Sequence, residues 1–135
     1  MRRILFTVGV LAASSGGAVA ADDLSQVCNQ DTNVAMTQCV TEHALAADKE
    51  LNALWPQVLK KVEAADYLGA AERKVWRDKL VSAERAWATF KDDDCRGAMA
   101  FEWYGGSGAG AAMGTCLYEK TTARIADLKA RYLDN

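Results

Sequence analysis

Four cysteines and a single histidine are the residues in this sequence best suited to covalent or metal chemistry. The cysteines are Cys28, Cys39, Cys95 and Cys116, and the histidine is His43. No two cysteines have the C-x-x-C spacing of zinc sites, c-type haem attachment or reactive dithiols. A serine nucleophile would need His43 beside it and an elbow motif to expose it, and the sequence has no such motif. We therefore expect no catalytic residue, no metal site and no cofactor.

An even number of cysteines is instead typical of disulfides in an exported chain. Four cysteines allow three pairings, and the count alone does not choose among them. We prefer Cys28–Cys39 with Cys95–Cys116, because each bond is local and closes a loop next to a helix start. The sequence thus predicts two structural disulfides.

The first twenty residues have the layout of a secretory signal peptide. Two arginines precede an apolar run over residues 4–13, and small residues follow at 18–20. The run is too short to span a membrane, and Cys28 lacks the small preceding residue expected at a lipid-attachment site. We predict a signal peptide over 1–20, one domain over 21–135, and a periplasmic or secreted protein that is not a lipoprotein.

The charge of the chain excludes some partners. The formal net charge is −2, and removing the first twenty residues with their two arginines makes it −4. Nonspecific nucleic-acid binding needs a basic face, so we expect no nucleic acid as a partner. No later stretch is long and apolar enough for membrane insertion. Mild acidity favours a cationic partner.

Three segments repeat apolar residues at helical spacings of three and four, which predicts helices over 33–65, 70–95 and 111–133. Thr32 is the expected N-cap of the first, and Pro56 should kink it near Asn52 or split it in two. The expected inner residues of the first helix are Met36, Val40, Ala44, Ala47, Leu51, Leu54, Val58 and Val62. Those of the second are Trp76, Leu80, Ala83, Trp87 and Phe90, and those of the third are Leu117, Thr121, Arg124 or Ile125, Leu128 and Tyr132.

Helices joined by short connections alternate in direction, which brings all four cysteines to one end. The predicted fold is therefore all-α: an antiparallel three-helix bundle with a kinked first helix and two disulfides at one pole. Such a thin bundle offers no obvious cleft for the paired carboxylates of a sugar hydrolase. An inward-facing Arg124 would need Asp92 or Glu84 as a partner.

A candidate binding surface follows the second helix. Asp92, Asp93 and Asp94 stand in its last turn, and Phe101, Trp103 and Tyr104 lie in a connection that we expect to run from Arg96 to the glycines at 105–110. Glycines make such a connection mobile, and aromatic residues beside charge suit a protein interface. No strand precedes the glycines, so a phosphate-binding loop is not indicated. The alternative is that the acids are merely a solvated surface, with one of them paired to Arg96.

Several blocks of the sequence resemble the lysozyme-inhibitor LprI N-terminal-domain family. Residues 32–39 end in Met-x-x-Cys, 47–52 resemble the next block, and 84–95 are similar to the most specific one, Arg-Ala-Trp-x-x-Phe-(Arg/Lys)-Asp-x-x-Cys. Gly105-Gly106-Ser107 and the segment from Cys116 to Leu128 look like the closing part. The sequence departs at Ala35, where the family often has the Glu that would complete a capping box with Thr32.

The resemblance implies an exported helical binding protein rather than an enzyme. Its partner would be a lysozyme, and a basic lysozyme would be attracted by an acidic inhibitor. The alternative is an exported structural or interaction module that binds another protein and does not inhibit lysozyme.

Overall fold

The computed structural model describes residues 24–134, and every regular element in that range is helical. The predicted signal peptide over 1–20 lies outside the described residues. The elements are α1 (Leu24–Val27), α2 (Asn33–Glu63), α3 (Ala70–Asp92), the π-helical segment η1 (Asp93–Ala98), α4 (Met99–Glu102) and α5 (Ala109–Tyr132). The all-α prediction is confirmed, and no helix in the described range is long and apolar enough to cross a membrane.

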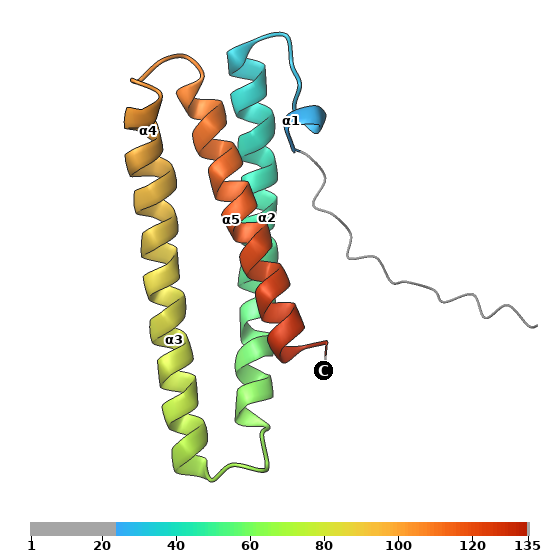
Figure 1. Ribbon diagram of the computed structural model, residues 1–135. Coiled ribbons are helices and arrows are strands. Elements are labelled where there is room, and N and C mark those ends of the chain that lie inside the picture. Colours follow the sequence, from blue (N-terminus) through green and yellow to red (C-terminus); the bar gives the residue numbers. More distant parts are fainter. Residues whose placement is uncertain (1–23, 135) are drawn as a thin grey trace, which may run out of the picture.

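Three rods make up most of the molecule. Figure 1 shows α2 and α5 starting at the same end and running side by side, while α3, η1 and α4 form a third rod that runs back. The turn between α2 and α3 lies at the opposite end from the connection between α4 and α5. These two connections span residues 64–69 and 103–108 and are equal in length.

The core lies mainly between α2 and α5. Seven of the eight residues predicted to line the inner face of α2 are buried, and the eighth, Met36, is partly buried. On α5, Thr121, Ile125 and Leu128 are buried as predicted. The helix starts as expected, because the Ala35 N–H donates to the Thr32 hydroxyl at 3.1 Å. It then continues through Pro56 without a break, which excludes two separate helices and leaves the kink a prediction.

The predicted inner face of α3 is wrong in part. Leu80 is buried, and Trp76 and Trp87 are partly buried against the core, but Ala83 and Phe90 are exposed. The reason is that α3 makes far fewer contacts with α2 and α5 than those two helices make with each other.

Ion pairs span the space between α3 and the other two helices. Lys91 Nζ lies 3.0 Å from Asp48 on α2, and Arg124 of α5 lies 2.7 Å from Glu84. The side chain of Arg124 is only 13% exposed, so Glu84 is the partner that its position required. Polar contacts thus replace part of the apolar seam expected along α3.

The boundary of the second predicted helix is also wrong. It does not stop at Cys95 but passes through η1 into α4 and ends at Glu102. Phe101 is therefore a helical residue, and the connection predicted over 96–110 is reduced to 103–108. Widened turns of this kind occur inside α-helices, often at functional sites. Here the widened turn contains Cys95, so it carries the disulfide partner while the helix continues.

Candidate functional site

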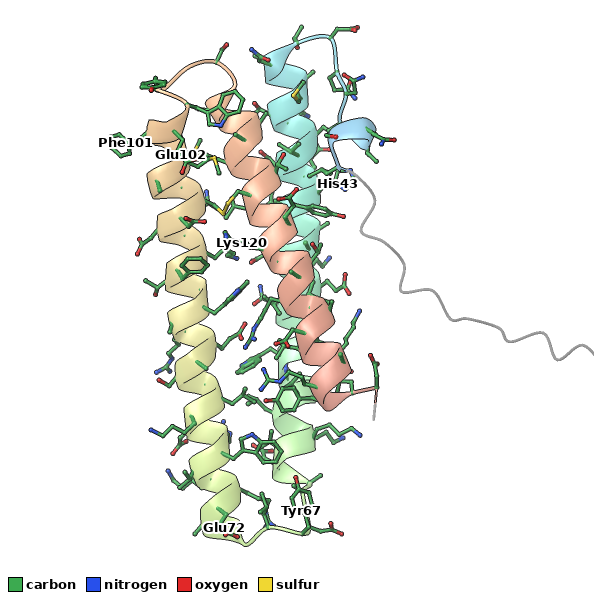
Figure 2. All side chains as sticks on the ribbon, in the orientation of Figure 1. His43, Tyr67, Glu72, Phe101, Glu102 and Lys120 are labelled. Carbon is green, nitrogen blue, oxygen red and sulfur yellow. A yellow bond between two sulfur atoms is a disulfide. The ribbon has the colours of Figure 1, made fainter. Side chains whose placement is uncertain are left out.

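Two disulfides define one end of the molecule, which we name the cysteine pole. Cys28 is bonded to Cys39, which ties the segment after α1 to α2. Cys95 is bonded to Cys116, which ties η1 to α5. This is the pairing preferred from the sequence. Figure 2 shows both sulfur pairs in the half of the molecule where the connection between α4 and α5 lies.

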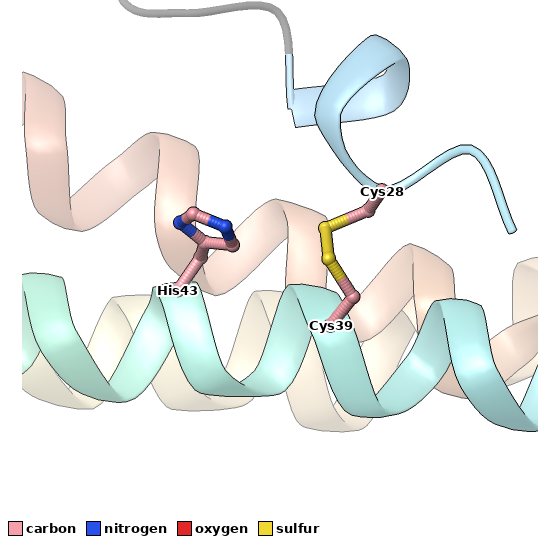
Figure 3. A group of neighbouring side chains, drawn as sticks. All are labelled: Cys28, Cys39 and His43. Atoms are coloured by element: carbon pink, nitrogen blue, oxygen red, sulfur yellow. A yellow bond between two sulfur atoms is a disulfide. The ribbon is translucent and has the colours of Figure 1, made fainter.

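Two groups at the cysteine pole have the composition of a metal site but not its chemistry. Cys28, Cys39 and His43, which Figure 3 draws together, have ligand atoms within 4.8 Å of one another, and Asp94 and the other disulfide form a second such group. Metal-binding cysteines are thiolates, and a sulfur bonded to another sulfur is not one. His43 instead packs edge-on against Tyr118, with ring centroids 6.0 Å apart. Both groups are thus accounted for as parts of the fold.

The three consecutive aspartates have different surroundings. Asp92 pairs with Arg96 at 3.0 Å, as the solvated alternative expected, and Asp94 pairs with Lys120 of α5 at 2.9 Å. Asp93 is exposed and has no ion-pair partner among residues 24–134. The acids therefore do not form one uniform patch. Asp93 is the one of the three whose charge is not paired within residues 24–134.

The connection over 103–108 is tied down by hydrogen bonds. The Gly105 N–H donates to the Ala100 carbonyl at 3.1 Å, and the Gly106 N–H donates to the Trp103 carbonyl at 2.8 Å. The Asn33 side-chain amide donates to the Ser107 hydroxyl at 2.8 Å, which joins the connection to the start of α2. Nothing local in the sequence marks Asn33 as a partner of Ser107, which lies 74 positions away.

The three aromatic residues differ in their exposure. Phe101 is 82% exposed and Tyr104 is 97% exposed, whereas Trp103 is 49% exposed. The Trp103 ring covers Gly108, where an added Cβ would lie 2.6 Å from the ring atom Cζ3. The structure thus separates Trp103, which packs within the connection, from Phe101 and Tyr104, which face solvent.

A hollow of about 600 Å³ lies between this connection and α5. Its wall includes the side chains of Met36, Met99 and Trp103 and the polar groups of Asn33 and Lys120. A second hollow of about 440 Å³ opens where α2, α5 and the third rod meet, beside Lys91 and Arg96. Neither Met99 nor Lys120 was singled out from the sequence, since their segments are distant in the chain and meet through the disulfide between η1 and α5 and the Asp94–Lys120 ion pair.

Comparison with known proteins identifies a family whose model covers most of the chain. The family model described as "Lysozyme inhibitor LprI" matches residues 26–128, a range that includes both disulfides. An uncharacterized protein of Rhizobium meliloti (strain 1021) is 34% identical over 112 residues, which is 76% of this chain and 73% of that protein. No solved structure matches the chain. By the extent of the family match, this chain belongs to the LprI lysozyme inhibitor family.

Proposed function

We propose that this protein is an exported helical binding protein that inhibits a lysozyme through its cysteine pole. The observation that carries the proposal is the family match over residues 26–128. We further propose that residues 1–20 are a cleaved signal peptide and that residues 21–135 work as one domain, an antiparallel bundle of three long helices. The protein then acts in the periplasm or outside the cell and has no enzymatic activity.

The surroundings of the cysteine pole support a binding role. The disulfide Cys95–Cys116 flanks the connection over 103–108 in the chain, and hydrogen bonds join this connection to α2 and α4. A surface held rigid before binding loses less entropy on association. Disulfides also persist in oxidising compartments, which agrees with export.

The charge of the protein supports a basic partner. Without the proposed signal peptide the formal net charge is −4. A basic lysozyme would be attracted to such a surface, and the attraction would speed its association. The partner-binding residues in this proposal are Asp92, Asp93, Asp94, Phe101, Trp103 and Tyr104.

The test is a lysozyme turnover assay with protein purified after export, so that both disulfides are intact. A basic c-type lysozyme is titrated with the protein, and we expect its activity to fall until the inhibitor is in molar excess. The same protein after reduction and alkylation is the control, and it should inhibit less. If the oxidised protein neither inhibits nor binds any of a panel of basic lysozymes, the alternative of an interaction module with another protein partner holds instead.

A further inference from the structure

We propose that Phe101 and Tyr104 are the contact that enters the substrate cleft of the lysozyme, and that Trp103 is a positioning residue behind them. This inference rests on the proposed function and assigns its mode, which is competition with the polysaccharide. The sequence predicted all three aromatic residues on the binding surface, whereas in the structure they differ in exposure.

Exposure distinguishes the two kinds of residue. Phe101 and Tyr104 are the most exposed large hydrophobic side chains among residues 24–134, at 82% and 97%. Figure 2 shows Phe101 on the outer side of the third rod, pointing away from α5. Aromatic side chains are typical anchors of interfaces, because they bury much area at little entropic cost. Their exposure in the free protein leaves this area available to a partner.

The backbone holds Tyr104 in an unusual conformation. Its φ is +51°, and among the described residues it is the one non-glycine residue with a positive φ. Tyrosine rarely adopts this left-handed region, and such outliers cluster at functional sites. Gly105 follows with φ +64°. Its N–H donates a hydrogen bond to the Ala100 carbonyl and so caps the end of the helix. The turn thus places the Tyr104 side chain in solvent just after the end of α4.

Trp103 supports this turn from the inside. Its carbonyl accepts the Gly106 N–H at 2.8 Å, and its ring lies over Gly108. An alanine at 108 would place Cβ 2.6 Å from the Trp103 ring, so the ring would have to move away from its present position. Trp103 also lines the hollow of about 600 Å³.

Shape and charge together indicate the occupant. Phe101 at the end of α4 and Tyr104 in the following turn expose most of their surface, so they can enter a concave site, and the concave site of a polysaccharide hydrolase is its substrate cleft. Glu102, next to Phe101 in the sequence, and Asp93, in η1 of the same rod, are exposed and have no ion-pair partner among residues 24–134. Such acids match the cationic surface of a basic lysozyme. The rings would then occupy space that the sugar units need.

The test compares alanine variants of the two rings with a matched tyrosine elsewhere. Tyr67 lies in the turn at the other end of the molecule (Figure 2), and it is 75% exposed. We expect Tyr104→Ala and Phe101→Ala each to raise the inhibition constant by about tenfold or more, as at a binding hot spot. Tyr67→Ala should leave the inhibition constant within about twofold of the wild type.

Two further measurements separate contact from positioning. With a soluble oligosaccharide substrate, the wild-type protein should raise the apparent KM of the lysozyme and leave kcat unchanged. Trp103→Ala and Gly108→Ala should both weaken inhibition, and Trp103→Phe should restore part of it, because a ring can again cover Gly108. Circular dichroism at the assay temperature checks that each variant is folded.

The outcomes distinguish this inference from the proposed function. If the wild type inhibits and the Phe101→Ala, Tyr104→Ala double variant inhibits equally well, the contact is wrong and the proposed function stands. If inhibition lowers kcat and leaves KM unchanged, the protein does not bind in the substrate cleft of the lysozyme, and this inference is wrong. If the folded wild type inhibits no lysozyme, both the proposed function and this inference fail.

Discussion

Trp87 and Trp103 differ in what surrounds their rings, although both are tryptophans in the same part of the sequence. The Trp87 ring packs against the core, with Lys91 Nζ 5.0 Å and the Arg124 guanidinium carbon 5.9 Å from its centroid. Trp103 is half exposed and covers a glycine in a connection. Removing the first ring therefore empties a site bordered by two helices, whereas removing the second loosens one turn.

We expect Trp87→Ala to lower the free energy of unfolding by about 3 kcal/mol, the lower end of the range for a core tryptophan, because its site is only partly buried. Trp103→Ala should lower it by about 1 kcal/mol, as for an ordinary substitution. Urea denaturation followed by circular dichroism measures both. Equal losses would mean that the connection over 103–108 is part of the main core.

At the scale of elements, the close approach of α2 and α5 depends on glycine. An added Cβ at Gly114 would collide with the Val40 side chain, and one at Gly110 would lie 2.9 Å from Thr37 Cγ2. Val40 is 2% exposed, so it has little room to move. The spacing of apolar residues did not reveal this contact, because a glycine adds nothing to a hydrophobic stripe.

We expect Gly114→Ala to destabilise the protein by about 1–3 kcal/mol, the usual cost of overpacking a core. Gly97 is the matched control, since it also lies in a helical segment and nothing is within 4 Å of an added Cβ. Gly97→Ala should stabilise by up to about 1 kcal/mol, because alanine is the better helix former. Thermal and urea denaturation of both variants test this, and shifts of the same sign would contradict the assigned contact.

At the scale of the whole molecule, the disulfides join segments that packing alone holds weakly. The bond Cys95–Cys116 connects the third rod to α5, two elements with few other contacts. The bond Cys28–Cys39 holds α1, a single helical turn, against α2. Each bond therefore holds a segment that has few other contacts to keep it in place.

Replacing either cysteine pair by alanine should lower the free energy of unfolding by about 3 kcal/mol, slightly more for the pair with the longer loop. The sequence separations are 21 residues for Cys95–Cys116 and 11 for Cys28–Cys39. Urea denaturation measures the stability of each variant. We further expect loss of Cys95–Cys116 to weaken lysozyme inhibition more, because that bond lies directly before the proposed contact. A greater loss of inhibition from the other pair would contradict this.

The net charge of the molecule leads to a prediction about rates. Replacing Asp92, Asp93 and Asp94 together by asparagine should slow association with a basic lysozyme and reduce its salt dependence, with a smaller effect on dissociation. The physical reason is that long-range attraction acts before contact and is screened by salt. Surface plasmon resonance at two ionic strengths measures both rates.

The control for this prediction removes three acids near the opposite end of the molecule, with Glu63→Gln, Asp66→Asn and Asp78→Asn. A hydrogen bond from Lys74 lowers the pKa of Asp78, which is therefore ionised at the neutral pH of the assay. The control changes the net charge by the same amount as the first set. If both sets slow association equally, only the total charge matters, and the cysteine pole is not where the lysozyme approaches.

Features that depend on local spacing could be predicted from the residues alone. The start of α2 at Thr32, its buried face and the inner face of α5 follow from capping and from helical periodicity, which involve residues a few positions apart. The preferred disulfide pairing rested on short separations in the chain, and the structure has that pairing. The family resemblance also came from short blocks of sequence, and the family match extends over 26–128.

Side-chain exposure and ion pairing depend on contacts between distant segments, and these contacts are seen only in the three-dimensional structure. Phe90 has the spacing of a core residue but is 54% exposed, because α3 stands farther from its neighbours than α2 does from α5. Asp92 and Asp94 differ from Asp93 through Arg96 and Lys120, one of which lies on another helix. The exposure of Phe101 and Tyr104 depends on where the third rod ends, and that end is set by bonds to Ala100 and Asn33 rather than by the glycines alone. Periodicity reports which face of a helix is apolar, but not how closely another helix approaches that face.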